Sequence, residues 1–360
     1  MSAYAKHIDS IAEKKINLYL CAMSRLVYIS RNYKTIGNGA GKARVDVEDI
    51  LSSHGAVNLG RPRSLHHNMA IDYMLNLSGI ISFMSRVMPG DVVFVQYPVK
   101  KYFRLICRWA HLRKASVVSL VHDLGSFRRK RISVPDEIRK LSLSDVVIAA
   151  NENTVRWLRE NGFRKPLTTQ VAWDFLSGIR HGAPDPDRLS VAFIGALSPS
   201  RNAFLYKLPR RIKLHLYGGG ADSTAKLPDG ITLHGFGEPD ALIENAQGRY
   251  GLIWYGPSTS EHLGYIGEYI KYCNPHKLAL YMRAGKPVII WKGSGAASFV
   301  EKEGIGLTVD SLDNLDRILD NVSEEQYRIM CANVERVASR MADGDFLLDA
   351  ISRAHRQLEK

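Results

Sequence analysis

The sequence lacks the features that mark several large classes of protein. Its four cysteines form no C-x-x-C pair, so neither a zinc site nor a redox motif is indicated. No apolar run reaches the roughly 20 residues that a bilayer span needs, and the N-terminus does not show the pattern of a secretory signal. We therefore expect a reduced compartment and a cytoplasmic protein, either free or peripheral at the inner face of the plasma membrane.

Acidic residues are also scarce. Lys and Arg number 49 against 36 Asp and Glu, which gives a formal net charge of +13 and predicts an anionic partner such as nucleic acid, a membrane or a phosphate compound. The densest basic run, which fits either anionic lipid or a solvated surface, is Arg128, Arg129, Lys130 and Arg131. A nucleic-acid binder would interleave exposed aromatics with its basic residues or carry a helix-turn-helix or RNA-recognition motif. The sequence shows neither, so nucleic acid is not the expected partner.

The first half of the sequence alternates between strand and helix patterns. Nearly continuous apolar runs predict strands buried on both faces at 91–99, 115–123 and 144–151. Helical spacing lies between these strands, at 100–114 and 133–143, and the second stretch opens with the helix-start residues Ser133 and Pro135. This order predicts a parallel sheet covered by helices.

A stretch rich in glycine and proline, 180–188, predicts a linker, after which the pattern resumes. The predicted strands of this half are 189–195, 212–218, 230–236, 250–256, 287–293 and 306–310. Four of the six end in glycine, at the strand ends where open α/β sheets bind ligands. We expect two Rossmann-like doubly wound α/β domains facing each other across a cleft, 1–180 and 181–345, with a C-terminal helix, 346–360, packed back on the first.

Two glycine-rich or acidic motifs are incomplete. The segment "GNGAGKA" at 37–43 has Ala43 where a P-loop needs Ser or Thr, and its third glycine has the wrong spacing for a dinucleotide fingerprint, so an NAD-dependent dehydrogenase is not favoured. It predicts a mobile loop instead. The D-x-D at Asp185 and Asp187 lies in the linker with no buried strand before it, so no metal site is expected there.

The stretch "NPHK" at 274–277 predicts an anion site. Pro275 suits the first helical position and Asn274 suits the cap before it. Lys277 then lies in the first turn, where a positive charge opposes the helix dipole unless an anion is bound at that end. The geometry indicates a diphosphate site, and the alternative is a lysine that extends into solvent.

These residues resemble a family when they are taken together. Segment 274–315 resembles the nucleotide-binding half of the bacterial galactofuranosyltransferases and Gtf3-type glucosyltransferases, which are glycosyltransferases of the GT-B fold. Other segments resemble the family's motifs in the same order: "GNGAGKARVDVEDIL" at 37–51, "VQYPV" at 95–99, "HDLGSFR" at 122–128 and "VAWDFL" at 171–176. The chain departs from the family pattern at "IGALSPSRN", 194–202, and at Tyr255, where W-D-G is common.

The resemblance implies transfer of a hexose, galactofuranose or glucose, from a UDP-sugar to a hydroxyl of a saccharide acceptor in cell-surface glycan assembly, with no metal or other cofactor. Lys277 and Arg201 would stabilise the charge that develops on the leaving diphosphate. The implied donor site comprises Arg201, Tyr217, Gly218, Gly219, Gly235, Tyr255, Asn274, Pro275 and Lys277. Tyr217 would flank the base or ribose, and Tyr255 and Asn274 would lie near the sugar.

The first domain would supply the acceptor side. Gly39, Gly41 and Lys42 would close over the cleft. An inverting transfer needs a base, and Asp46, His122 and Asp123 are candidates that the sequence does not rank. His122 and Asp123 also fit residues hydrogen-bonded by their neighbours. The donor sugar, the linkage, inversion or retention, a homo-oligomer and a non-catalytic sugar-binding scaffold all stay open.

Overall fold

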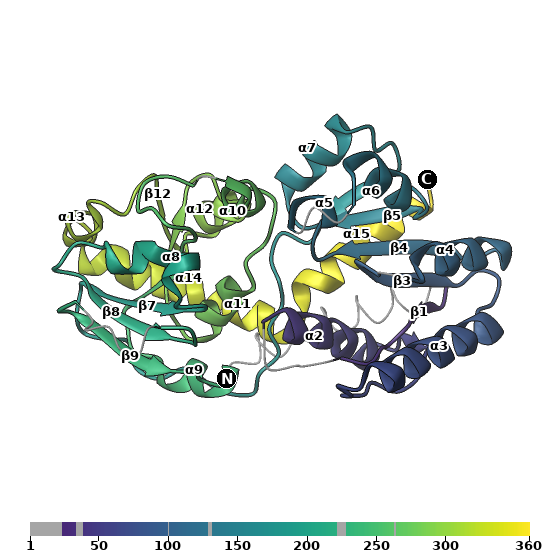
Figure 1. Ribbon diagram of the computed structural model, residues 1–360, viewed down its shortest axis with the longest axis horizontal. Coiled ribbons are helices and arrows are strands. Elements are labelled where there is room, and N and C mark those ends of the chain that lie inside the picture. The colour runs from purple at the N-terminus through teal and green to yellow at the C-terminus, as the bar shows by residue number, and fades with distance from the viewer. Residues whose placement is uncertain (1–23, 34–38, 100, 129–131, 222–227, 263) are drawn as a thin grey trace, which may run out of the picture. The chain divides into compact units, whose positions relative to one another are not determined.

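The computed structural model describes residues 24–33, 39–99, 101–128, 132–221, 228–262 and 264–360 (Figure 1). The chain divides into two compact α/β units. The first unit holds the described residues up to Ala150, Val155–Gln170 and Leu347–Lys360, and the second holds Asn151–Thr154 and Val171–Phe346. Both units are built on six-stranded sheets, and the parallel pairing of their strands agrees with the sequence prediction.

The sheet of the first unit has the order β2-β1-β3-β4-β5-β6, and all its pairs are parallel. Its strands are β1 Leu26–Tyr28, β2 Val57–Asn58, β3 Val92–Tyr97, β4 Ser116–Val121, β5 Val146–Ala149 and β6 Leu167–Thr169. Every residue of β3 and β5 is buried, which explains their continuous apolar sequences.

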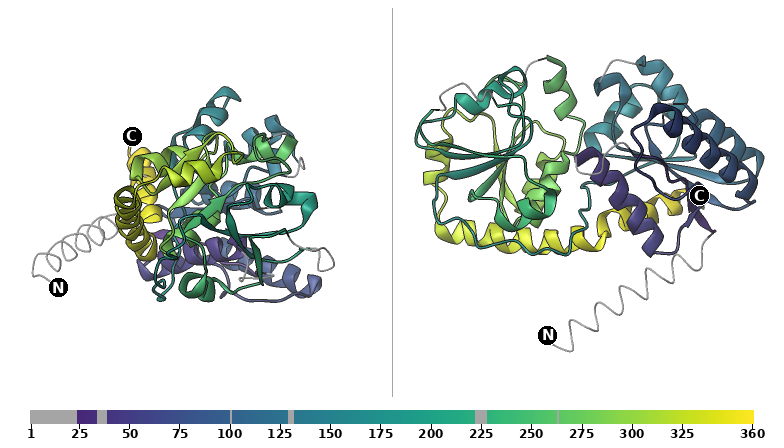
Figure 2. Two further views of the ribbon diagram at one scale, coloured as in Figure 1. Left: turned by 90° about the vertical axis from the view of Figure 1, so that its left-hand side faces the viewer. Right: turned by 60° about the horizontal axis from the view of Figure 1, so that its bottom comes forward.

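Helices pack on this sheet (Figure 1, Figure 2). They are α2 Gly39–Ser53, α3 Met69–Arg86, α4 Phe103–Leu112, α5 Gly125–Arg128, α6 Val134–Leu141, α7 Glu152–Glu160 and α15 Asp345–Leu358. Ser133 caps α6 as predicted, since its side chain accepts a hydrogen bond from the Asp136 N–H.

The sheet of the second unit has the order β12-β11-β10-β7-β8-β9, again all parallel. Its strands are β7 Ser190–Ile194, β8 Lys213–Tyr217, β9 Ile231–Gly235, β10 Tyr250–Ile253, β11 Val288–Trp291 and β12 Gly306–Val309. Its helices are α8 Pro199–Asn202, the 3-10 helix η1 Ala203–Tyr206, α9 Pro239–Asn245, α10 Gly264–Ile270, α11 His276–Arg283, α12 Ala297–Glu303, α13 Leu315–Asp320 and α14 Glu324–Asp343. Phe193, Phe204 and Trp254 are fully buried in its core.

All nine strands predicted from the sequence are present, each somewhat shorter than its apolar run. Apart from Asn151–Thr154, the second unit begins at Val171, where the prediction places residue 181. The side chains of Trp173 and Asp174 bond within this unit. Trp173 Nε1 donates to the Asn274 carbonyl at 2.9 Å, and Asp174 Oδ1 accepts from the Phe346 N–H at 3.1 Å. The C-terminal helix predicted at 346–360 is α15, and it is separate from α14 because Gly344 adopts φ +81° and ends α14.

None of the helices that the structure describes combines the length and apolar character that crossing a bilayer requires. The predicted basic membrane contact cannot be placed, because residues 129–131 and the side chain of Arg128 lie outside the described part of the chain.

Candidate donor site

The carboxyl ends of β7 and β8 are joined by main-chain hydrogen bonds between glycine-containing loops. The Gly195 N–H donates to the Tyr217 carbonyl at 2.8 Å, and the Leu197 N–H donates to the Gly219 carbonyl at 2.9 Å. The Gly218 N–H donates to the Gly235 carbonyl at 2.7 Å, which extends the link to β9. The loops therefore form one connected platform beyond the strand ends.

Three predicted glycines have different environments on this platform. A Cβ on Gly218 would lie 1.8 Å from the Gly195 carbonyl oxygen, and φ there is +143°, so only glycine fits. A Cβ on Gly219 or Gly235 would meet nothing within 4 Å. Gly218 thus maintains close packing, whereas Gly219 and Gly235 border open space in which a ligand could approach the backbone.

The segment before α11 differs from the prediction in one respect. Pro275, not Asn274, is the N-cap, and α11 starts at His276. Asn274 is buried, its side-chain oxygen accepts from Asn151 Nδ2 at 3.1 Å, and its carbonyl accepts from Trp173 Nε1. Asn274 therefore fixes the approach to the helix instead of capping it.

Lys277 lies in the first turn of α11, and its ammonium group reaches the end of β7. Nζ lies 4.2 Å from the ring centre of Phe193 and 4.4 Å from that of Tyr255. A Cβ on Gly195 would lie 3.4 Å from the same nitrogen, so an added side chain there would crowd it. The ammonium is thus held between two aromatic rings at the edge of the platform.

Burial dominates the electrostatics of this position. It lowers the pKa of Lys277 to about 7 and raises the pKa of the Tyr255 hydroxyl well above its usual range. Among the residues that the structure describes, no carboxylate pairs with Lys277. A desolvated cation without a carboxylate partner in the first turn of a helix is an arrangement that an anion would stabilise.

The short helix α8 follows β7 and borders the platform. Arg201 on α8 is exposed. Asn202, which the sequence analysis did not select, donates from Nδ2 to the Ala196 carbonyl at 2.8 Å and accepts from the Gly256 N–H at 3.3 Å. Asn202 therefore ties the β7 loop to the β10 loop, and only this tertiary contact reveals its role.

Tyr217 does not take the predicted position beside a nucleotide. Its ring is buried and stacks on His234, with centroids 4.5 Å apart and planes at 7°, and its hydroxyl accepts from the Gln247 N–H at 2.7 Å. Gln247 leads into the amino end of β10, so the side chain points along the sheet and away from the strand ends. The geometry gives Tyr217 a packing role.

The first unit contains the candidates for the acceptor side. Gly39, Gly41 and Lys42 lie in the first turn of α2, so they form helix rather than the predicted loop. Lys42 Nζ pairs with Asp46 Oδ1 at 2.6 Å, one turn further along the helix. Asp46 is buried, so this ion pair fixes the position of its carboxylate.

His122 and Asp123 follow β4. His122 Nε2 donates to Gln96 Oε1 at 2.7 Å, and Gln96 Nε2 donates to the Arg44 carbonyl at 3.1 Å. The histidine at this strand end thus belongs to a hydrogen-bonded chain that leads back to α2, and Asp123 is half-buried next to it.

The D-x-D segment bonds to the protein itself. Asp185 accepts from Ser190 Oγ at 2.8 Å and from the Gly248 N–H at 3.0 Å, while Asp187 pairs with Lys213 at 2.5 Å. These carboxylates therefore fix the conformation of the segment that leads into β7. Within the described ranges, no group of three or more potential metal ligands is present.

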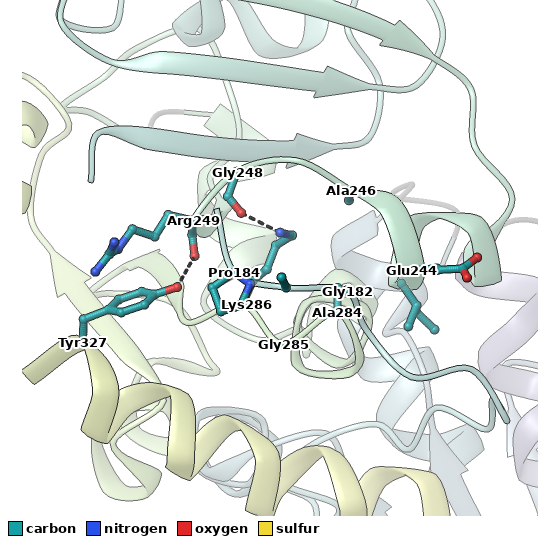
Figure 3. A pocket seen from close by; sticks show the side chains of 12 residues that line it. Gly182, Pro184, Glu244, Ala246, Gly248, Arg249, Ala284, Gly285, Lys286 and Tyr327 are labelled. Atoms are coloured by element: carbon teal, nitrogen blue, oxygen red, sulfur yellow. Dashed lines mark hydrogen bonds between the residues drawn. The ribbon is translucent and has the colours of Figure 1, made fainter. Parts of the chain in front are cut away.

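A polar pocket lies at the opposite, amino end of the same sheet (Figure 3). Lys286 Nζ donates to the Gly248 carbonyl at 2.5 Å in this pocket, and the Tyr327 hydroxyl donates to the Arg249 carbonyl at 3.3 Å. The loops that form it precede β7, β10 and β11. The Lys286 and Tyr327 side chains thus bond to the main chain, and the pocket is separate from the Lys277 platform.

Comparison with known proteins agrees with the two-unit division. The profile of the glucosyltransferase 3-like N-terminal domain matches residues 26–172, and that of the C-terminal domain matches residues 191–354. The chain belongs to the glucosyltransferase 3-like family. The resemblance stated from the sequence motifs is therefore confirmed, and this family member is a glycosyltransferase.

Two relatives cover most of the chain at 25% identity. The β-1,6-galactofuranosyltransferase WbbI of Escherichia coli K12 aligns with 86% of this chain and 92% of its own length. Glucosyltransferase 3 of Streptococcus parasanguinis aligns with 89% of this chain and 95% of its own length.

Solved structures identify the fold. The α,α-trehalose 6-phosphate synthase of Burkholderia multivorans matches 94% of this chain and 99% of its own, with a TM-score of 0.55 and 12% identity. The predicted GT-B fold is confirmed.

Proposed function

We propose that the protein transfers a hexose from a UDP-sugar to a hydroxyl of a saccharide acceptor without a metal ion. The observation that carries this proposal is the desolvated Lys277 ammonium at the start of α11, 4.4 Å from the Tyr255 ring centre and without a carboxylate partner in the described chain. The names of the relatives suggest galactofuranose or glucose as the hexose. The setting that we propose, glycoconjugate assembly in the cytoplasm, follows from the sequence motifs alone.

The reaction needs stabilisation of the leaving group. The acceptor oxygen forms a bond to the anomeric carbon while the bond from that carbon to the β-phosphate oxygen breaks, and the electron pair leaves with UDP. Negative charge therefore grows on the diphosphate, where Lys277 and the N–H groups of α11 would stabilise it, with Arg201 on α8 in support. The open backbone at Gly219 and Gly235 would admit the nucleotide.

The acceptor proton requires a base in an inverting transfer. Asp46, His122 and Asp123 are the proposed candidates from the first unit. His122 and Asp46 are both held by neighbours, at 2.7 Å from Gln96 and 2.6 Å from Lys42, so their positions are defined before substrate arrives.

Calorimetry of UDP, UDP-glucose and UDP-galactofuranose, each with and without EDTA, tests the proposal. We expect micromolar UDP binding that EDTA does not change, and a loss of at least tenfold in affinity for Lys277→Met because a charge-assisted contact is removed. The matched control is Lys302→Met, which removes an exposed lysine on α12. No UDP binding at millimolar concentration, or equal affinity of the two variants, would contradict the proposal.

A turnover assay separates the enzyme from a non-catalytic scaffold. With each UDP-sugar and a saccharide acceptor, the enzyme should release UDP with formation of a glycosylated product. Binding without any release of UDP would favour the scaffold.

A further inference from the structure

The outward face of α3 is apolar and carries no charge. Ile71, Met74, Ser78, Ile81 and Ser85 recur at helical spacing, on the side opposite the buried Ile80 and Phe83. Met74 is 62% exposed and Ile81 is 59% exposed, which is unusual for large apolar side chains that repeat along one helix. We call these five positions the α3 stripe.

Helix α4 packs against α3. Trp109 Nε1 donates to the Met84 carbonyl at 2.9 Å, and Lys101 Nζ lies 5.1 Å from the ring centre of Tyr73, so the two helices are joined near both ends. Helix α3 connects β2 to β3 and helix α4 connects β3 to β4, and both connections run in the same direction across the sheet. Because such crossovers are right-handed, the two helices lie on the same face of the sheet.

The exposed arc of α4 combines basic and apolar residues. Arg104, Leu105, Arg108 and Leu112 are exposed and fall within about one third of the helix circumference. Leu112 is 70% exposed. Together, the α3 stripe and this arc form a continuous helical surface, which we call the α3–α4 face.

Basic residues predominate around this face. Asp136 on α6 lies close enough to interact with Arg104 but pairs with Arg139, and Asp145 pairs with His111 of α4. Residues 61–114 contain nine Lys and Arg but only two acidic residues, Asp72 and Asp91. Asp91 is buried and pairs with Arg25 at 2.7 Å, and Asp72 accepts from Asn32 Nδ2 at 2.8 Å. Both carboxylates are thus engaged within the protein, and exposed guanidinium and ammonium groups flank the apolar stripe.

We propose that the α3–α4 face docks on an anionic lipid bilayer. An apolar stripe flanked by arginine and lysine fits the boundary between acyl chains and negatively charged headgroups. A two-fold pairing of this face with a second copy would bring the same positive groups together, which disfavours self-association. The inference concerns the first unit alone and does not depend on the donor sugar.

Flotation of the full chain with vesicles tests the docking. The vesicles are phosphatidylcholine alone or phosphatidylcholine with 30 mol% phosphatidylglycerol, at low and high salt. We expect binding only to the anionic vesicles, weakened by salt because the headgroup attraction is screened. Equal binding to both vesicle types, or none to either, would overturn the proposal.

Two double variants assign the binding to this face. Met74→Gln with Ile81→Gln removes apolar contact, and Arg104→Gln with Arg108→Gln removes positive charge; each should weaken anionic-vesicle binding roughly tenfold or more. The controls are Ile329→Gln and Arg317→Gln, which alter exposed residues of the second unit. Circular dichroism should show that all variants stay folded, since the substituted side chains are exposed.

Three outcomes would overturn the assignment. If either double variant binds anionic vesicles as tightly as the parent chain, another surface of the protein docks. Sedimentation velocity that shows a dimer dissociated by Met74→Gln with Ile81→Gln would identify a second copy as the occupant. If the chain binds to a column of acidic protein and none of the variants loses vesicle binding, the occupant of this face is a protein partner instead.

Discussion

Lys277 is the residue on which the donor site depends. Most lysines near a helix start point into water, but this one ends between Phe193 and Tyr255, and burial lowers its pKa to about 7. Near neutral pH its protonated fraction is therefore sensitive to the charge of whatever binds beside it.

Binding of UDP should be coupled to proton uptake. An anion next to Lys277 stabilises the ammonium form and raises its pKa, so at pH 8 the free protein is mostly neutral at this position and takes up a proton on binding. Affinity should accordingly fall as the pH rises above about 7. Calorimetry at pH 8 in two buffers of different ionisation enthalpy measures the number of protons.

The phosphate groups of UDP are already ionised at pH 8, so they contribute little to this exchange. Lys277→Met should abolish the uptake. An uptake that persists in this variant would assign the proton to another group.

Gly218 tests the packing of the platform. Gly218→Ala places a Cβ 1.8 Å from the Gly195 carbonyl oxygen at a φ of +143°, so we expect a loss of several kcal/mol in the free energy of unfolding and loss of UDP binding. Gly219→Ala is the matched control, since its Cβ meets nothing within 4 Å. Denaturant unfolding compares the two, and equal stability would show that the loops move apart at little cost.

At the scale of elements, helix α11 connects the platform to the core. Tyr281 is fully buried, and its hydroxyl accepts from the Ile194 N–H at 2.9 Å and lies 3.1 Å from the Ala192 carbonyl. The same helix that carries Lys277 is thus hydrogen-bonded to the end of β7.

Tyr281→Phe should lower the free energy of unfolding by about 1–3 kcal/mol, because it leaves the half-buried Ile194 N–H without this partner. UDP affinity should fall as well, because the loss of this hydrogen bond changes the position of the main chain at Ile194 and therefore at Gly195, which lies beside Lys277. Tyr327→Phe is the control: its hydroxyl bonds to Arg249 at the amino end of the sheet, so it should change stability and leave UDP affinity unchanged. Unchanged UDP affinity in both variants would show that the packing of α11 against β7 does not influence donor binding.

The helices and strands that could be predicted are those with a sequence pattern long enough to identify the element from its own residues. The continuous runs of β3, β4 and the second sheet identified strands, and Ser133 identified the start of α6. Strands β1, β2 and β6 have only two or three residues each, too few for a periodic pattern, and depend on neighbouring strands for their pairing.

The same limit applies to the site. The placement of Lys277 in the first turn of α11 follows from Pro275 and the helical pattern, which are local. The side chains of Asn274, Asn202 and Tyr217 are oriented by Asn151, Gly256 and Gln247, which are distant in the sequence. Local patterns carry no information on such partners.

At the scale of the whole molecule, the last helix belongs to two units. Phe346 bonds to Asp174 in the second unit, while residues 347–360 count with the first. Leu347, Ala350, Ile351 and Ala354 are buried. Arg353 donates to Thr168 Oγ1 at 3.2 Å and to the Thr169 carbonyl at 2.8 Å, which fixes the helix to β6.

Removal of residues 347–360 should destabilise the first unit selectively. Each buried Leu or Ile contributes about 1.5–3 kcal/mol, so several kcal/mol are lost, and amides of β5 and β6 should exchange faster with deuterium. Exchange in β7 and β10 should change little. The control truncation removes only Glu359 and Lys360, which follow α15. Equal acceleration in both sheets would show that the units unfold as one.

The position of residues 347–360 also determines the order in which the protein can mature during translation. The ribosome releases most of the first unit early, but the residues that complete it are made only after the entire second unit has been synthesised. Although most of the first unit is synthesised before the second, its β6 side therefore stays uncovered until residues 347–360 have been made.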